Sequence, residues 1–131
     1  MKTLFIVAGA VEMLGGLTFV LTPSLQADLL FGASLSGPAE TMMARVMGVA
    51  MMALGLAFWQ GRKEPQAPTA RGLAVVMLVY NTAVAVLAAS GVGSPVSAVG
   101  VWPATGLHAA LAAWCAWNLR AGGPRRPSAD G

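Results

Sequence analysis

Four residues with reactive or hydrogen-bonding side chains stand inside otherwise apolar stretches of this chain. They are Glu12, Arg45, Asn81 and His108, and each falls in a different stretch. Together a carboxyl, a guanidinium, an amide and an imidazole could hold an anion, exchange a proton or bind the polar groups of a ring compound. Which of these they do depends on the helices that carry them.

The composition indicates that the apolar stretches cross a membrane. Of the 131 residues, 56% are hydrophobic and only 10% are charged, and the mean hydropathy is +0.69. A soluble domain has about 25% charged residues. One Cys excludes an internal disulfide, and no charge run or low-complexity tract indicates disorder or nucleic-acid binding. We therefore expect a single-domain integral membrane protein whose first partner is the lipid bilayer.

Four stretches are long enough to cross a bilayer, which needs about 20 mostly apolar residues for each helix. The predicted helices lie near 3–22, 39–60, 71–90 and 101–120. They predict an all-α fold, a four-helix transmembrane bundle over residues 1–121. Residues 122–131 are predicted to form a flexible cytoplasmic tail, because they are polar and rich in Pro and Gly.

The segment Ser24 to Phe31, between the first two spans, has two interpretations. It is either a short helix on the membrane surface that stops at Gly32, or an ordinary connecting loop. The first span itself could also be a cleavable signal peptide, but Glu12 would then interrupt its apolar core.

The basic residues predict the orientation of the spans. Seven of the eight fall on one side of the four-span arrangement, namely Lys2, Arg62, Lys63, Arg71, Arg120, Arg125 and Arg126. Because cytoplasmic loops carry an excess of Lys and Arg, both termini are expected to face the cytoplasm, with the chain in the inner membrane.

Helical spacing predicts that the four polar residues face the centre of the bundle. The inward stripes are Gly9, Glu12 and Gly16; Arg45, Gly48, Met52, Gly55 and Trp59; Ala74, Met77, Asn81 and Ala85; and Ala104, His108, Leu111 and Cys115. At 1.5 Å per residue, Glu12 and Asn81 lie near mid-membrane, and Arg45 lies roughly 9 Å below the outer end. We expect Glu12, Arg45, Asn81 and His108 to line one chamber, where Glu12 and Arg45 could form an ion pair.

Such a chamber suits a small hydrophobic or redox ligand, with a quinone as the leading example. A quinone carbonyl needs a hydrogen-bond donor such as His108 or Asn81, and Glu12 could exchange the proton that accompanies reduction. A small anionic or protonatable substrate fits the same groups. If Glu12 and Arg45 only pair with each other, their role is structural.

Haem and copper are less favoured cofactors. Thioethers bind Cu(I), and Met43, Met47 and Met51 lie one turn apart, but Met is also a common packing residue and no Met or Cys partner is placed on another helix. His108 is the only His, so a haem would need a Met ligand or a second protomer. The sequence assigns neither metal ligands nor catalytic residues.

The pattern of the whole chain resembles the small four-helix bacterial membrane proteins grouped as DoxX-like. The resemblance is carried by a Gly-rich first helix ending in Leu21-Thr22-Pro23, by Ala44-Arg45-Val46-Met47-Gly48, by the segment Gly55 to Trp59, and by Trp102-Pro103 with His108. Some members of that group are linked to quinone-dependent oxidation. The resemblance therefore implies a link to quinone-dependent oxidation. Our leading expectation is a bundle that binds such a ligand, or an accessory subunit beside a membrane electron-transfer enzyme.

The chain is also similar in size and span number to small multidrug resistance transporters, which carry a membrane-embedded Glu in the first helix, as Glu12 is here. Such transporters work as dimers and exchange protons for cationic drugs, so this likeness implies proton-coupled transport by a homo-oligomer. Arg45 and His108 would repel a cationic substrate. We expect ligand binding first, with transport or a purely structural membrane subunit as the alternatives.

Overall fold

The computed structural model describes residues 1–91 and 99–121, and these residues contain five helices. The helices are α1 (Lys2–Leu21), α2 (Pro23–Phe31), α3 (Pro38–Gly61), α4 (Pro68–Ser90) and α5 (Val101–Ala121). The protein is all-α as predicted, and α1, α3, α4 and α5 match the predicted spans to within three residues at every end. The predicted tail lies outside the described residues.

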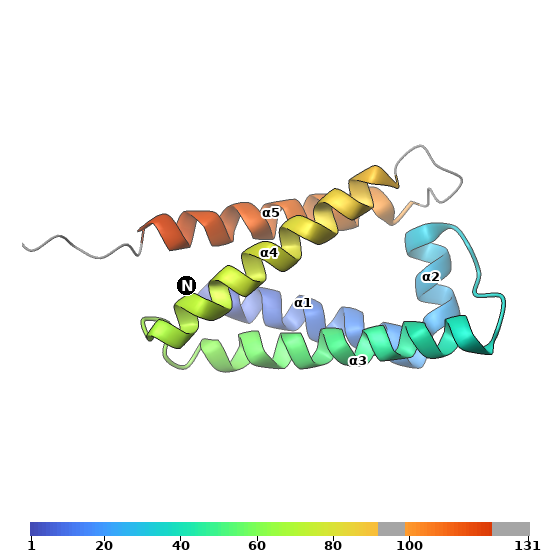
Figure 1. The fold of residues 1–131 in the computed structure, drawn as a ribbon, viewed down its shortest axis with the longest axis horizontal. Helices are drawn as coiled ribbons and strands as arrows, with labels where there is room; N and C mark the ends of the chain where they lie inside the picture. The colour runs from blue at the N-terminus through green and yellow to red at the C-terminus, as the bar shows by residue number, and fades with distance from the viewer. Residues whose placement is uncertain (92–98, 122–131) are drawn as a thin grey trace, which may run out of the picture.

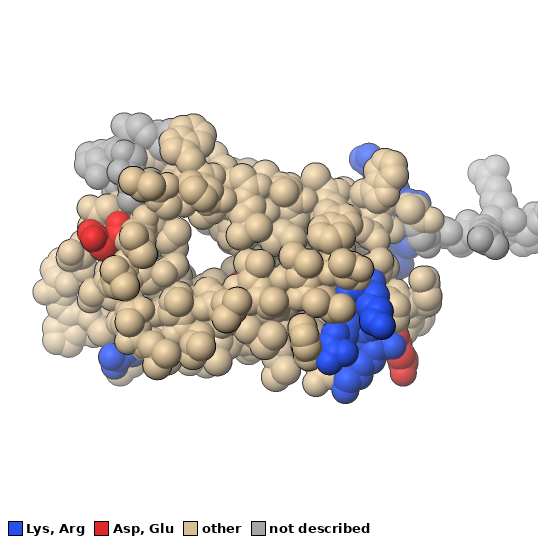
Figure 2. Space-filling model, turned by 180° about the vertical axis from the view of Figure 1, so that it is seen from behind, with Lys and Arg blue, Asp and Glu red and all other residues tan. Residues whose placement is uncertain are grey.

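The four long helices form two layers (Figure 1). Helix α1 packs against α3 in one layer, and α4 packs against α5 in the other. Helix α2 stands across one end of the molecule, between the end of α1 and the start of α3. We call this the α2 end. The opposite end holds Lys2, Arg62, Lys63, Arg71 and Arg120, and we call it the basic end. Figure 2 shows most of the Lys and Arg side chains gathered there.

Helix α2 decides between the two interpretations of the first long connection, because Ser24 to Phe31 is helical. Pro23 occupies its first turn, where the missing N–H costs no helical hydrogen bond. The helix ends at Gly32, which has φ 66° and ψ 19°, a left-handed conformation that glycine adopts without a steric penalty. That α2 lies on a membrane surface stays a prediction.

Three helices are long and apolar enough to cross a membrane, namely α1, α3 and α4. Helix α5 has 21 residues, but Trp, His and Asn side chains make it less apolar than the other three. The described residues therefore support a helical membrane protein with three clear candidate spans.

The layer of α1 and α3 is held by contact between the two helix backbones. A Cβ atom added to Gly16 would lie 2.5 Å from the Gly48 carbonyl oxygen, and one added to Gly55 would lie 2.9 Å from the Gly9 carbonyl oxygen. Only glycine allows such an approach. Close packing of this kind holds membrane helices together where apolar burial alone supplies no driving force.

The two layers meet mainly toward the basic end. A buried cluster joins them there, formed by Leu4, Phe5, Ala8, Phe58, Ala70, Ala74, Met77, Leu111 and Cys115. Toward the α2 end the layers separate, and Figure 2 shows an opening that passes through the molecule between them. The fold therefore combines a packed half with a hollow half.

Candidate functional site

Glu12 lies where the packed half gives way to the hollow half, and its side chain is 0% exposed. The Tyr80 hydroxyl donates a hydrogen bond to Glu12 Oε2 over 2.9 Å, which links α1 to α4. The other carboxyl oxygen, Oε1, is buried and has no hydrogen-bond partner within the described ranges. A buried carboxyl costs free energy unless its oxygens are hydrogen-bonded. Tyr80 therefore offsets part of the cost of placing Glu12 here.

Asn81 and His108 form a second polar pair, between α4 and α5. Asn81 is also 0% exposed. Its Nδ2 donates to the Met77 carbonyl oxygen over 2.8 Å, and its Oδ1 lies 2.8 Å from His108 Nδ1. The rings of Tyr80 and His108 meet edge to face, with centroids 5.9 Å apart and planes at 78°. This contact joins the two pairs into one polar group of Glu12, Tyr80, Asn81 and His108.

A cavity of about 670 Å³ begins at this group and extends toward the α2 end. Its lining is formed by Phe19, Leu30, Phe31, Met47, Ala50, Met51, Leu54, Tyr80, Val84, Leu87, Ala88, Ser90, Gly91, Val101, Ala104 and His108. All five helices contribute, and among the described lining residues only Tyr80, Ser90 and His108 have polar side chains. Pockets of about 300–1,000 Å³ that are mostly apolar, with a few polar groups, are typical sites for small ligands.

Helix geometry explains how α4 serves both polar pairs. Successive residues of a helix point about 100° apart, so Tyr80 and Asn81 face different neighbours. Asn81 lies on the buried stripe with Ala74 and Met77, as the spacing predicted, and faces α5. Tyr80 faces α1 and the cavity.

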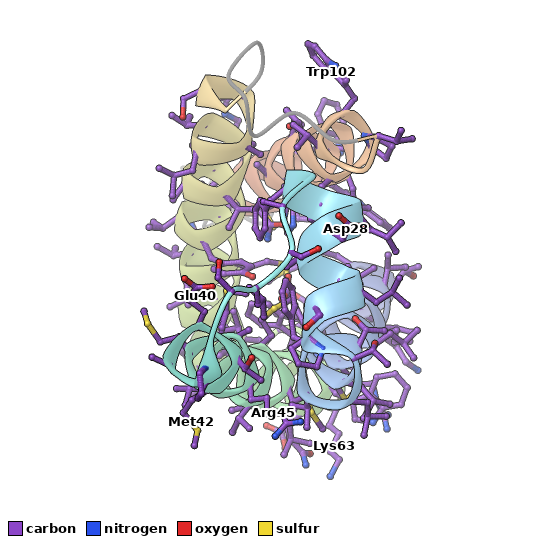
Figure 3. All side chains as sticks on the ribbon, turned by 90° about the vertical axis from the view of Figure 1, so that its right-hand side faces the viewer. Asp28, Glu40, Met42, Arg45, Lys63 and Trp102 are labelled. Carbon is purple, nitrogen blue, oxygen red and sulfur yellow. The ribbon has the colours of Figure 1, made fainter. Side chains whose placement is uncertain are left out.

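The structure brings together three of the four predicted site residues, Glu12, Asn81 and His108, but not Arg45. The Arg45 side chain is exposed, and Figure 3 shows it pointing away from α4 and α5. The glycine contacts explain the distance from Glu12, because they place Glu12 level with Met52, seven residues beyond Arg45 or about 10 Å along α3. The expected ion pair is therefore not formed.

The direction of the Arg45 side chain also has a local cause. The buried positions of α3 are Ala44, Gly48, Gly55 and Phe58, so the inward stripe enters α3 at Ala44. Arg45 stands one residue further around the helix. Arg45 is three residues before Gly48 and Ala44 is four residues before it, and both spacings fit one face of a helix. The sequence therefore could not show whether the buried stripe begins at Ala44 or at Arg45.

Tyr80 belongs to the candidate site but was missed by the sequence analysis. It is the only Tyr in the chain and lies next to Asn81, near the middle of a predicted span. A hydroxyl so deep in an apolar helix needs a partner on another helix. That requirement, together with the buried carboxyl of Glu12, was the available signal.

Replacing Tyr80 by Phe tests the bond to Glu12. The substitution keeps the ring against His108 but leaves the buried carboxyl without its hydrogen-bond donor. We expect the free energy of unfolding to fall by about 1–2 kcal/mol. Unfolding in mixed micelles with increasing SDS would measure it. Thr82→Val removes an exposed hydroxyl from the same helix and should change the value by less than about 0.5 kcal/mol.

The site contains hydrogen-bonding and titratable groups but no metal-binding cluster. Within residues 1–91 and 99–121, no three His, Cys, Asp or Glu side chains lie close enough together to hold a metal ion. Cys115 is buried in the apolar cluster between the layers. The arrangement can hold the polar end of an apolar ligand and offer it a phenol and an imidazole, with the Glu12 carboxyl buried behind the phenol.

Comparisons of the chain with models of protein families, with characterised proteins and with solved structures find no match.

Proposed function

We propose that the protein is a small inner-membrane protein that binds an apolar ring ligand of quinone type inside the bilayer, alone or as an accessory subunit of an electron-transfer complex. One observation supports this above the others. The apolar cavity of about 670 Å³ ends at Tyr80 and His108, which contact the buried side chains of Glu12 and Asn81. A quinone head group has the same division, with an apolar ring and polar oxygens.

The cavity favours ligand binding over a purely structural role. If the polar residues served only packing, they would satisfy one another and leave no space beside them. Instead, Glu12 Oε1 lacks a partner within the described part of the chain, and the cavity lies next to the group. The layers also separate at this level, so a ligand dissolved in the bilayer has a route between them (Figure 2).

In the proposed arrangement α5 is the fourth membrane crossing, which completes a four-helix transmembrane bundle. Its length of 21 residues suffices, and its polar residues His108 and Asn118 lie against other parts of the protein. The basic end then faces the cytoplasm, because Lys and Arg gather there. The cavity lies in the outer half of the membrane, and the DoxX-like resemblance is in keeping with this layout.

The protein purified gently from its own membrane tests the proposal. Native mass spectrometry, lipid extraction and an absorbance spectrum would identify a ligand that stays bound. We expect a quinone-type compound at close to one per chain, with occupancy reduced about 10-fold by His108→Phe, since one hydrogen bond in the site is worth roughly that factor. Leu107→Phe adds the same ring at an exposed neighbouring position and should leave the occupancy unchanged.

Two results would contradict the proposal. The first is a protein that stays empty and takes up neither added decylubiquinone nor its reduced form. The second is equal loss of ligand in the His108→Phe and Leu107→Phe variants. If the empty protein instead moved protons across vesicle membranes when a cationic drug was added, the transporter alternative would replace ligand binding.

A further inference from the structure

Within residues 1–91 and 99–121, the polar side chains that line the cavity already use their hydrogen-bond donors. The Tyr80 hydroxyl donates to Glu12 Oε2, and the Ser90 hydroxyl donates to the Leu87 carbonyl oxygen over 2.7 Å. The third polar side chain on the lining is His108, whose Nδ1 is held by Asn81. What these three groups can still offer a ligand is lone pairs.

The Met77 backbone carbonyl determines which atom donates in the hydrogen bond between His108 and Asn81. Its carbonyl oxygen can only accept, so the Asn81 atom that faces it must be the Nδ2 donor. The Asn81 atom that faces His108 is then Oδ1, which also only accepts. His108 Nδ1 must therefore carry the hydrogen. In a neutral imidazole with Nδ1 protonated, Nε2 is an acceptor.

We infer that the ligand is a hydrogen-bond donor, namely the hydroxyl-bearing ring form, a quinol or related phenol, rather than the quinone. Its hydroxyl would donate to His108 Nε2, while the Tyr80 oxygen could accept a second bond from a ligand hydroxyl. This inference rests on the proposed function, because it names the form of ligand that the same cavity takes. It also reverses the expectation that His108 or Asn81 donates to a quinone carbonyl.

In a bilayer, hydrogen bonding and not apolar burial determines which ring compound the cavity binds. Lipid tails are as apolar as the cavity wall, so moving a ring from lipid into the cavity gains little from apolar burial. A hydroxyl group in lipid tails has no acceptor, whereas the cavity offers His108 and Tyr80. A carbonyl oxygen gains less from the described part of the same wall, because its three polar side chains have their hydrogens bonded elsewhere. Asn81 thus acts as a positioning residue for His108.

Three matched ligands test the inference on the unaltered protein in lipid nanodiscs. They are decylhydroquinone, its dimethyl ether and decylbenzoquinone, which share the ring and tail but differ in their oxygen groups. Dissociation constants would be measured without oxygen, after subtracting partition into empty nanodiscs. We expect the hydroquinone to bind at least about 10-fold more tightly than the ether and the quinone. In His108→Phe this preference should shrink to about 2-fold or less.

The outcomes separate the inference from the proposed function. If all three compounds bind equally, or the quinone binds best, the site is a ligand site but the assigned polarity is wrong. If none of the three binds, the proposed function fails and the inference fails with it. If the hydroquinone binds best in the wild type and in His108→Phe alike, His108 is not the acceptor, and the inference in its present form is overturned.

Discussion

Gly48→Ala is expected to lower the free energy of unfolding by about 2–3 kcal/mol, although it adds a single methyl group. The new Cβ would lie 2.6 Å from the Gly16 carbonyl oxygen and 2.9 Å from the Phe19 Cβ. A backbone oxygen cannot rotate away as a side chain can, so α1 and α3 must separate. Separation also weakens the close packing that holds these two membrane helices together.

The matched control for this variant is Gly106→Ala in α5. Among the described residues, no atom of a neighbouring helix lies within 4 Å of the position that its Cβ would take. Alanine forms helices more readily than glycine by about 1 kcal/mol, so this variant should be equally stable or more stable than the wild type. In SDS unfolding, Gly48→Ala should therefore unfold at a lower SDS fraction than the wild type, whereas Gly106→Ala should unfold at the same or a higher fraction. Equal stability of the two variants would show that the contact of the helix backbones is not required.

Ala104→Trp should weaken ligand binding by a factor of about 10–100 while leaving the fold intact. Ala104 is half-buried and lines the cavity, so an indole ring at this position would occupy the space that the ligand needs. Fitting both would require overpacking, which costs about 1–3 kcal/mol, or a factor of about 10–100 in affinity. The unfolding midpoint should stay close to that of the wild type, because the indole fills an existing space.

Binding of decylhydroquinone in nanodiscs would measure the effect. The control, Ala109→Trp, adds the same ring at an exposed position of α5 that does not line the cavity. Its affinity for the hydroquinone should equal that of the wild type. If Ala104→Trp bound the hydroquinone with unchanged affinity, the ligand would have to occupy another part of the protein.

The sequence predicted the long helices well, because their ends depend on local signals. Pro38 sits in the first turn of α3, and charged residues follow directly after its end. The inward direction of Glu12, Asn81 and Leu111 was also predictable, since each lies on a helical stripe of small or apolar residues.

What the sequence could not supply was the pairing and register of the helices. Arg45 was misplaced because its level relative to Glu12 depends on how Gly16 and Gly48 meet. The cavity was not predictable either, because it reflects the separation of two layers and not a property of one helix. Tyr80 joins the site through α1, a neighbour that the spacing within α4 does not reveal.

The order of the layers has a consequence for how this protein is made. The long helices pair in the order in which they are synthesised, α1 with α3 and then α4 with α5, so each layer is a hairpin of consecutive long helices. The first hairpin can insert and close through its glycines before the second is synthesised. The cavity then forms only when the second hairpin docks on the first. The two hairpins contact each other mainly through the buried cluster near the basic end. Docking of the two layers and formation of the cavity are therefore one late event in assembly.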